Sequence, residues 1–185
     1  MSQAVLDETL DKVKQQLQEN NFQLMKARLG FMGHKGSTFF STILMGLNVY
    51  YDDSVPTAAT NGLDIKINMP WFLNLTSQER IGLLLHEVLH VAMLHMQRLG
   101  ERCIGKFNRA CDYSINLIAK DAGFVLPPNG LIDEKYRDMT PEAIYELLED
   151  EPSDTEQGDV EFGEPDPNLQ DEIDNLLVTA AQAAE

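Results

Sequence analysis

Residues 76–94 read TSQERIGLLLHEVLHVAML, and this stretch decides how the rest of the chain is interpreted. Thr76 and Glu79 have the spacing of a capping box, in which each side chain bonds the other residue's backbone amide at the start of a helix. The residues that follow are almost all apolar, and Gly100 is the first residue suited to end the helix. The sequence therefore predicts one long, largely buried helix from residue 77 toward Gly100.

Three ionisable side chains interrupt this apolar helix: His86, Glu87 and His90. At about 100° per residue, His86 and His90 lie about 40° apart on one face, so both imidazoles can bind the same Zn²⁺. Glu87 is adjacent and can reach a water molecule at the open position of the metal. A packing role is the alternative, but buried ionisable groups need partners. We interpret the pattern as a zinc hydrolase motif of the HExxH type.

A catalytic zinc site uses three protein ligands, so a third residue is needed. His95 is nearest in sequence, but it lies about 180° around a continuous helix from His86, and residues 91–94 show no break. We expect His95 to support the site or the core and keep it as the less favoured ligand.

Asp112 is the predicted third ligand. It lies on a second apolar helix, roughly residues 107–120, which can pack against the first. Asn108 and Asn116 stand one turn to either side and could hydrogen-bond the second nitrogens of the ligand histidines. An ion pair of Asp112 with Arg109 is the alternative.

A small sheet is predicted before the motif helix. Asn61-Gly62 is typical of a hairpin turn between two extended runs. The second run, residues 63–68, alternates apolar and polar side chains, as a half-buried strand at a sheet edge does. Its polar edge could receive an extended peptide by strand addition. An amphipathic helix over residues 3–28 is expected to pack on the core, with fraying near Asn20.

The charge of the chain is uneven. The net charge is −16, and residues 138–185 contain 16 acidic and no basic side chains, so the body has as many bases as acids. A neutral body with an acidic tail argues against nucleic acid and against an anionic membrane as partners. We expect a domain over residues 1–150 and a largely disordered acidic tail over 151–185. The acidic tail and a short helix within it, over 168–184, could recruit a protein partner.

The N-terminus shows no secretory signal, and no apolar run reaches the length that spans a membrane. Two cysteines are too few for a disulfide framework, which favours a reducing compartment. A cytoplasmic location is the expectation.

Four separated motifs resemble one known family. They are residues 55–62, 86–90, 108–116 and 130–148, and they look like the "Putative metallopeptidase domain" associated with VWA-like domains in bacteria and their phages. The resemblance covers about residues 4–150. It implies an α+β, zincin-like fold: a small mixed or antiparallel sheet with an edge hairpin, packed on the HExxH helix and a second ligand-bearing helix. His95 also belongs to the usual pattern of that family.

The predicted function is zinc-dependent hydrolysis of a peptide or protein substrate, with one Zn²⁺ per chain. Glu87 acts as the general base, and Tyr113 and Tyr136 are candidates for stabilising the transition state. Two alternatives remain open. One is a zinc-dependent endoribonuclease that uses three histidines, and the other is a catalytically inactive, metal-binding interaction domain.

Overall fold

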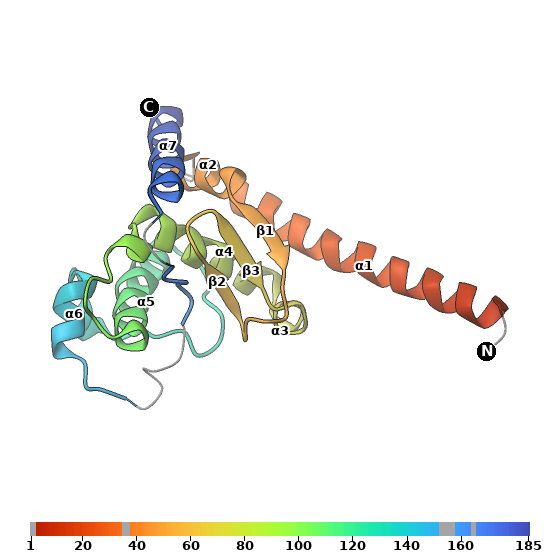
Figure 1. The fold of residues 1–185 in the computed structure, drawn as a ribbon, viewed down its shortest axis with the longest axis horizontal. Coiled ribbons are helices and arrows are strands. Elements are labelled where there is room, and N and C mark those ends of the chain that lie inside the picture. Colours follow the sequence, from red (N-terminus) through yellow and green to blue (C-terminus); the bar gives the residue numbers. More distant parts are fainter. Residues whose placement is uncertain (1–2, 35–37, 152–157, 164–165) are drawn as a thin grey trace.

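The computed structural model describes residues 3–34, 38–151, 158–163 and 166–185, with side chains from residue 9 onward. Helices flank a small sheet (Figure 1). None of the described helices has the length and apolar character needed to cross a membrane. In chain order the elements are α1 (Gln3–Met32), α2 (Thr38–Gly46), β1 (Asn48–Tyr51), β2 (Ala58–Thr60), β3 (Asp64–Ile67), α3 (Met69–Asn74), α4 (Ser77–Ala92), η1 (His95–Gln97), α5 (Ile104–Asp121), η2 (Glu134–Tyr136), α6 (Pro141–Leu147) and α7 (Pro167–Ala183).

The sheet is mixed, with strand order β1-β3-β2. β2 and β3 form the predicted antiparallel hairpin, and Gly62 takes a φ of 106° in its turn, which suits glycine. The prediction of an α+β fold with a small mixed sheet is confirmed. The placement of residues 63–68 at a sheet edge is wrong, because β1 pairs in parallel with the other side of β3. The strand of the hairpin that lies at an edge is β2.

Helix α4 occupies the centre of the core. Its predicted capping box is present, with Thr76 N donating to Glu79 Oε2 at 2.7 Å and Glu79 N donating to Thr76 Oγ1 at 3.3 Å. Every residue from Ile81 to Val91 is buried, because α4 contacts α1, α2, α5 and β2. Polar side chains on this stretch must therefore find their partners inside the protein.

The predicted continuation of this helix toward Gly100 is wrong. α4 ends at Ala92, and Leu94 takes a left-handed conformation with φ of 55° before the turn η1. Arg98 stabilises the turn: its guanidinium donates to the backbone carbonyl of residue 93 at 3.1 Å and to Glu142 of α6 at 2.7 Å. The helix thus ends without a glycine or proline at the break, and Arg98 links the turn that follows to α6.

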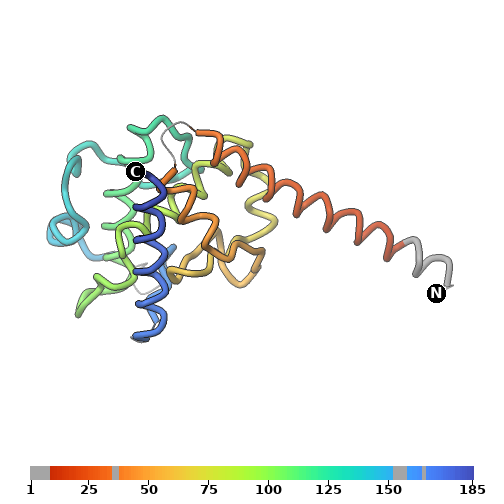
Figure 2. Tube along the Cα trace, turned by 90° about the horizontal axis from the view of Figure 1, so that it is seen from above, coloured from red at the N-terminus to blue at the C-terminus, as the bar shows by residue number. Residues whose placement is uncertain are grey.

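Helix α1 runs unbroken through Asn20, where fraying was predicted. Its second half packs on the core through Leu24, Ala27 and Phe31. Its first half projects away from the body, as both views show (Figures 1 and 2). Only the second half of α1 therefore belongs to the core.

The helix predicted over residues 168–184 is present as α7, and it packs against α2 (Figure 1). Ile173 and Ala180 are buried in the main core. Leu176 lies so close to Gly46 that a Cβ at that position would overlap it. The chain thus supplies its own partner for this helix, which the sequence alone did not reveal.

A short part of the acidic region, residues 158–162, lies along β2; we call it the tail segment. Thr60 N donates to the carbonyl of Asp159, and Glu161 N donates to the carbonyl of Thr60, both at 2.8 Å. The intervening Val160 is fully buried. Disorder was predicted for this region; residues 152–157 and 164–165 lie outside the described residues, whereas the tail segment is extended and paired.

Candidate metal centre

His86 and His90 face each other on one side of α4. Their Nε2 atoms are 3.0 Å apart, and both residues are buried. This arrangement follows directly from the four-residue spacing, which places the two side chains one above the other on adjacent helical turns.

Asp112 reaches the same point from α5. Its Oδ1 lies 3.3 Å from Nε2 of His90 and 3.7 Å from Nε2 of His86. Ligands held at about 2.0–2.1 Å in a tetrahedron stand about 3.3 Å apart, so the three atoms have the spacing that one zinc ion requires. Oδ1 of Asp112 is also buried without a hydrogen-bond partner, as an atom reserved for a cation would be.

The second nitrogen of each histidine is held by another side chain. Nδ1 of His86 lies 2.8 Å from Oδ1 of Asn116, whose amide group donates to the carbonyl of Leu131 at 3.1 Å. Nδ1 of His90 lies 2.9 Å from Nδ1 of His95. The amide oxygen of Asn116 accepts from Nδ1 of His86, whereas the donor in the contact between His90 and His95 depends on the tautomers of the two rings.

His95 is therefore brought to the site, but not to the point where the three ligand atoms meet. The turn at Leu94 brings the ring of His95 edge-on against the ring of His90, with centroids 5.0 Å apart, whereas a continuous helix would place it on the far side. It is not among the described groups of side chains that could share an ion. Its contact with Nδ1 of His90 holds the ring of a candidate ligand.

Glu87 has an unusual environment. Its side chain is fully buried, and neither carboxylate oxygen has a hydrogen-bond partner. It forms a second group with His86 and Asp159, in which the ligand atoms lie within 4.8 Å of one another. A buried carboxylate with no protein partner is costly, which indicates that it serves something other than packing.

Asp159 is the residue that the sequence analysis missed. It belongs to the tail segment, and its Oδ2 lies 3.3 Å from Nε2 of His86. The signal available in the sequence is weak: Asp159-Val160-Glu161-Phe162 alternates polar and apolar residues within an otherwise acidic, proline-bearing stretch. Such a short alternation predicts a strand only when its partner is known.

The electrostatics of the cluster favour a cation. Burial raises the pKa of Glu87 well above its usual value and raises that of Asp112 to about 6. Burial lowers the pKa of His86, but the hydrogen-bonding carboxylate of Asp159, with the charges of Asp112 and Glu87, outweighs this effect and raises it to about 10. The pKa of His90 is held well below its usual value by burial. The carboxylates of Asp112, Glu87 and Asp159 thus all act on His86, and a divalent ion bound beside it would be attracted by the same charges.

The remaining predicted residues lie elsewhere. Asn108 does not bond a histidine; its Oδ1 accepts from the amide of Val160 at 3.3 Å. The rings of Tyr113 and Tyr136 contact each other at a tilt of 55°, with centroids 4.8 Å apart, in a small separate core between α5 and α6. That core lies on the side of α5 that packs against α6, whereas Asp112 points toward α4.

Residues 20–175 match the model of a protein family described as "Putative metallopeptidase domain". The chain belongs to this family. The match begins where α1 becomes buried, and it includes the cluster on α4 and α5 as well as the tail segment. No curated protein and no solved structure matches the chain.

Membership of this family and the grouping of His86, His90 and Asp112 support the same conclusion. Both fit a metal-dependent hydrolase. The family match also spans the segment that bonds β2.

Proposed function

We propose that this protein is a zinc-dependent metallopeptidase in which His86, His90 and Asp112 hold one Zn²⁺ and Glu87 is the general base. The observation that carries the proposal is the convergence of three buried ligand atoms from two helices, spaced 3.0, 3.3 and 3.7 Å apart. Two imidazole nitrogens and one carboxylate oxygen form a donor set typical of catalytic zinc, which keeps a fourth position open.

When bound, the zinc ion would polarise the scissile carbonyl and lower the pKa of a water molecule to about 7. Glu87 follows a ligand directly in sequence, and its two oxygens bond no protein group. It is therefore free to accept the proton of the attacking water and to pass it to the leaving amine. Its burial raises its pKa, which brings the carboxylate closer to the range where it can both accept and donate a proton.

The substrate would bind along β2. β3 is paired on both sides, so it cannot receive a peptide, whereas β2 is an edge strand whose outer side is bonded at Thr60 by the tail segment. An extended chain added to that edge would gain main-chain hydrogen bonds and pass close to His86, as the tail segment does. Main-chain recognition of this kind suits peptide bonds of varied sequence.

One observation favours a second candidate, a structural metal site. Oδ2 of Asp159 lies 3.3 Å from Nε2 of His86, in a separate group with His86 and Glu87, so a shift of this carboxylate toward His90 and Asp112 would make it a fourth ligand and close the coordination sphere. Three-histidine ribonuclease chemistry has less support, since His95 contacts Nδ1 of His90 and lies outside the groups that could hold an ion.

The decisive experiment compares the parent with Glu87→Gln. Metal content after purification and dialysis against zinc is measured by mass spectrometry, and hydrolysis by cleavage of a mixed peptide library. We expect one zinc per chain in both proteins and cleavage only by the parent. Equal cleavage by the variant would refute the role of Glu87, and bound zinc without cleavage by any form of the protein would support the structural site.

A further inference from the structure

The tail segment makes the contacts that a bound peptide would make. It runs parallel to β2, and two main-chain hydrogen bonds join it to Thr60. Main-chain bonds to an edge strand are the common feature of peptide recognition by strand addition. The segment therefore occupies the Thr60 end of the edge that the proposed function assigns to substrate.

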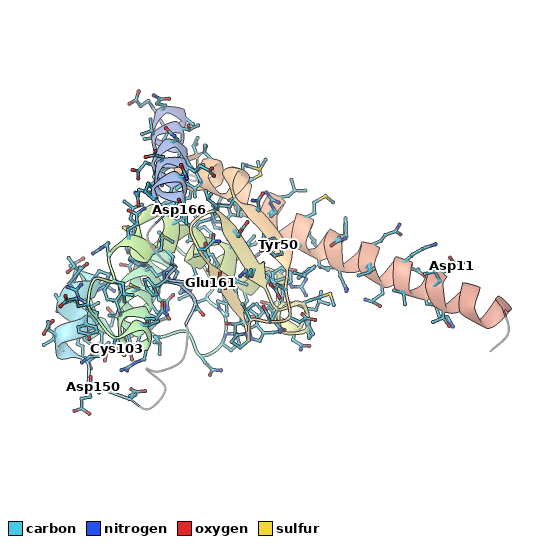
Figure 3. All side chains as sticks on the ribbon, in the orientation of Figure 1. Asp11, Tyr50, Cys103, Asp150, Glu161 and Asp166 are labelled. Carbon is cyan, nitrogen blue, oxygen red and sulfur yellow. The ribbon has the colours of Figure 1, made fainter. Side chains whose placement is uncertain are left out.

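The side chains of Val160, Glu161 and Phe162 each contact a different part of the protein. Val160 is fully buried, and its amide donates to Asn108. Glu161 forms an ion pair with Lys66 of β3 at 2.9 Å, and its position beside the sheet is labelled in Figure 3. The ring of Phe162 packs on Phe107 of α5, with centroids 6.1 Å apart.

The start of the segment is fitted closely to α5. At Gly158 a Cβ would overlap the side chain of Asn108, so a residue with a side chain would push the segment away. Asp159 then turns its carboxylate toward His86, within 3.3 Å of Nε2. The side chain of Asp159 thus contacts the candidate metal centre, while the main chain of the segment is bonded to β2.

We propose that the tail segment is a built-in competitor of substrate, which holds the peptide site closed by pairing with β2 and by placing Asp159 against the metal cluster. This inference rests on the proposed function. It also describes the peptide that would replace the segment: an extended chain with a small apolar side chain in the Val160 position and an acidic side chain opposite Lys66.

Two variants would release the segment by different means. Val160→Asp places a charge in a fully buried position, and Glu161→Lys places a like charge opposite Lys66 while leaving the core intact. The matched controls are Val178→Asp and Glu172→Lys, which make the same changes at exposed positions on α7. Circular dichroism checks that each variant is folded.

The first measurement is binding of a fluorescent peptide with the sequence of residues 158–162 to each zinc-loaded protein, with a scrambled peptide as reference. A site that is about 90% occupied by its own segment binds a competitor about tenfold more weakly than a vacant one. We expect both release variants to bind the peptide at least about tenfold more tightly than the parent, and the controls to bind it as the parent does.

The second measurement is hydrogen exchange at the amides of Thr60 and Glu161. We expect protection in the parent and in the controls, and faster exchange in the release variants. Folded release variants that bind the peptide no better than the controls would overturn the proposal, as would fast exchange of both amides in the parent.

Hydrolysis separates this inference from the proposed function. If release increases peptide binding but no form of the protein cleaves peptides, the competitor stands and the peptidase assignment fails. If the parent cleaves peptides and release changes neither binding nor cleavage, the peptidase stands and the competitor is refuted.

Discussion

Oδ1 of Asn116 lies 2.8 Å from Nδ1 of His86, so a side chain on α5 fixes the ring of a residue on α4. The Asn116 amide is itself oriented by its bond to the carbonyl of Leu131. The two helices that would supply the metal ligands are thus joined by a contact outside the ligand set. Such outer contacts fix the orientation and the tautomer of a ligand histidine.

Replacing Asn116 with Ala is expected to weaken zinc binding by about 10–100-fold, because His86 loses the acceptor that orients it. The dissociation constant would be measured by competition with a chromophoric chelator. Asn175→Ala, at an exposed position on α7, serves as the control and should leave the constant unchanged. Unaltered zinc affinity in the Asn116 variant would show that the contact has no bearing on the metal.

Replacing Asp112 with Asn tests the third ligand through stability. Zinc at 100 times its dissociation constant should raise the free energy of unfolding of the parent by about 2.7 kcal/mol, and this gain should disappear in the variant. Without metal, the variant should be at least as stable as the parent, because a buried carboxylate with an unpartnered oxygen has been made neutral. Urea unfolding with and without zinc measures both effects, and Asp171→Asn is the control. Full zinc stabilisation of the Asp112 variant would exclude Asp112 as a ligand.

The ion pair of Arg98 and Glu142 gives a pH dependence. The hydrogen bonds from Arg98 lower the pKa of Glu142 to about 2 from the ordinary value of 4.5. Because the folded-state pKa is depressed, the contribution of Glu142 to stability is present above about pH 4.5 and is lost as the pH falls toward 2. The pair is partly exposed, so we expect about 0.5–1 kcal/mol at neutral pH.

Urea unfolding of the parent and of Glu142→Gln between pH 7 and pH 3 checks this prediction. The difference in stability between the two proteins should shrink as the pH falls, while Glu146→Gln, an exposed change on the same helix, should match the parent throughout. A difference that is constant with pH would show that the charge of Glu142 is not what stabilises the turn.

Helix α7 is expected to stabilise the domain. Ile173 is 1% exposed and packs in the main core, so Ile173→Ala should lower the free energy of unfolding by about 2–5 kcal/mol. Val178 on the same helix is 57% exposed, and Val178→Ala should change stability by less than about 0.5 kcal/mol. Thermal unfolding of both variants gives the comparison. Equal effects would mean that α7 adds little to the core.

The parts of the site that follow helical periodicity could be predicted from the sequence. The four-residue spacings of His86 and His90, and of Asp112 and Asn116, each place two side chains on one face, and one contact between α4 and α5 then brings the faces together. The β2–β3 hairpin followed from Asn61-Gly62 for a similar reason, since the turn is decided by local residues.

The parts that depend on distant contacts could not be predicted. The position of His95 depends on a break at Leu94, a residue that rarely takes positive φ and is held there by neighbours such as Arg98. The central position of β3 depends on pairing with β1, and that of Asp159 on pairing of its segment with β2. Pairing partners of short strands leave little trace in local sequence pattern.

The pairing of residues 158–162 with β2 also bears on solubility. A strand at the edge of a sheet offers a row of unpaired amides and carbonyls, which other chains can use as a template for aggregation. In this molecule the outward amide and carbonyl of Thr60 already form hydrogen bonds with residues 159 and 161 of the same chain. Conditions that detach residues 158–162 from β2 would therefore promote aggregation through the exposed edge. A preparation treated in this way should be kept dilute or supplied with a peptide that pairs with β2.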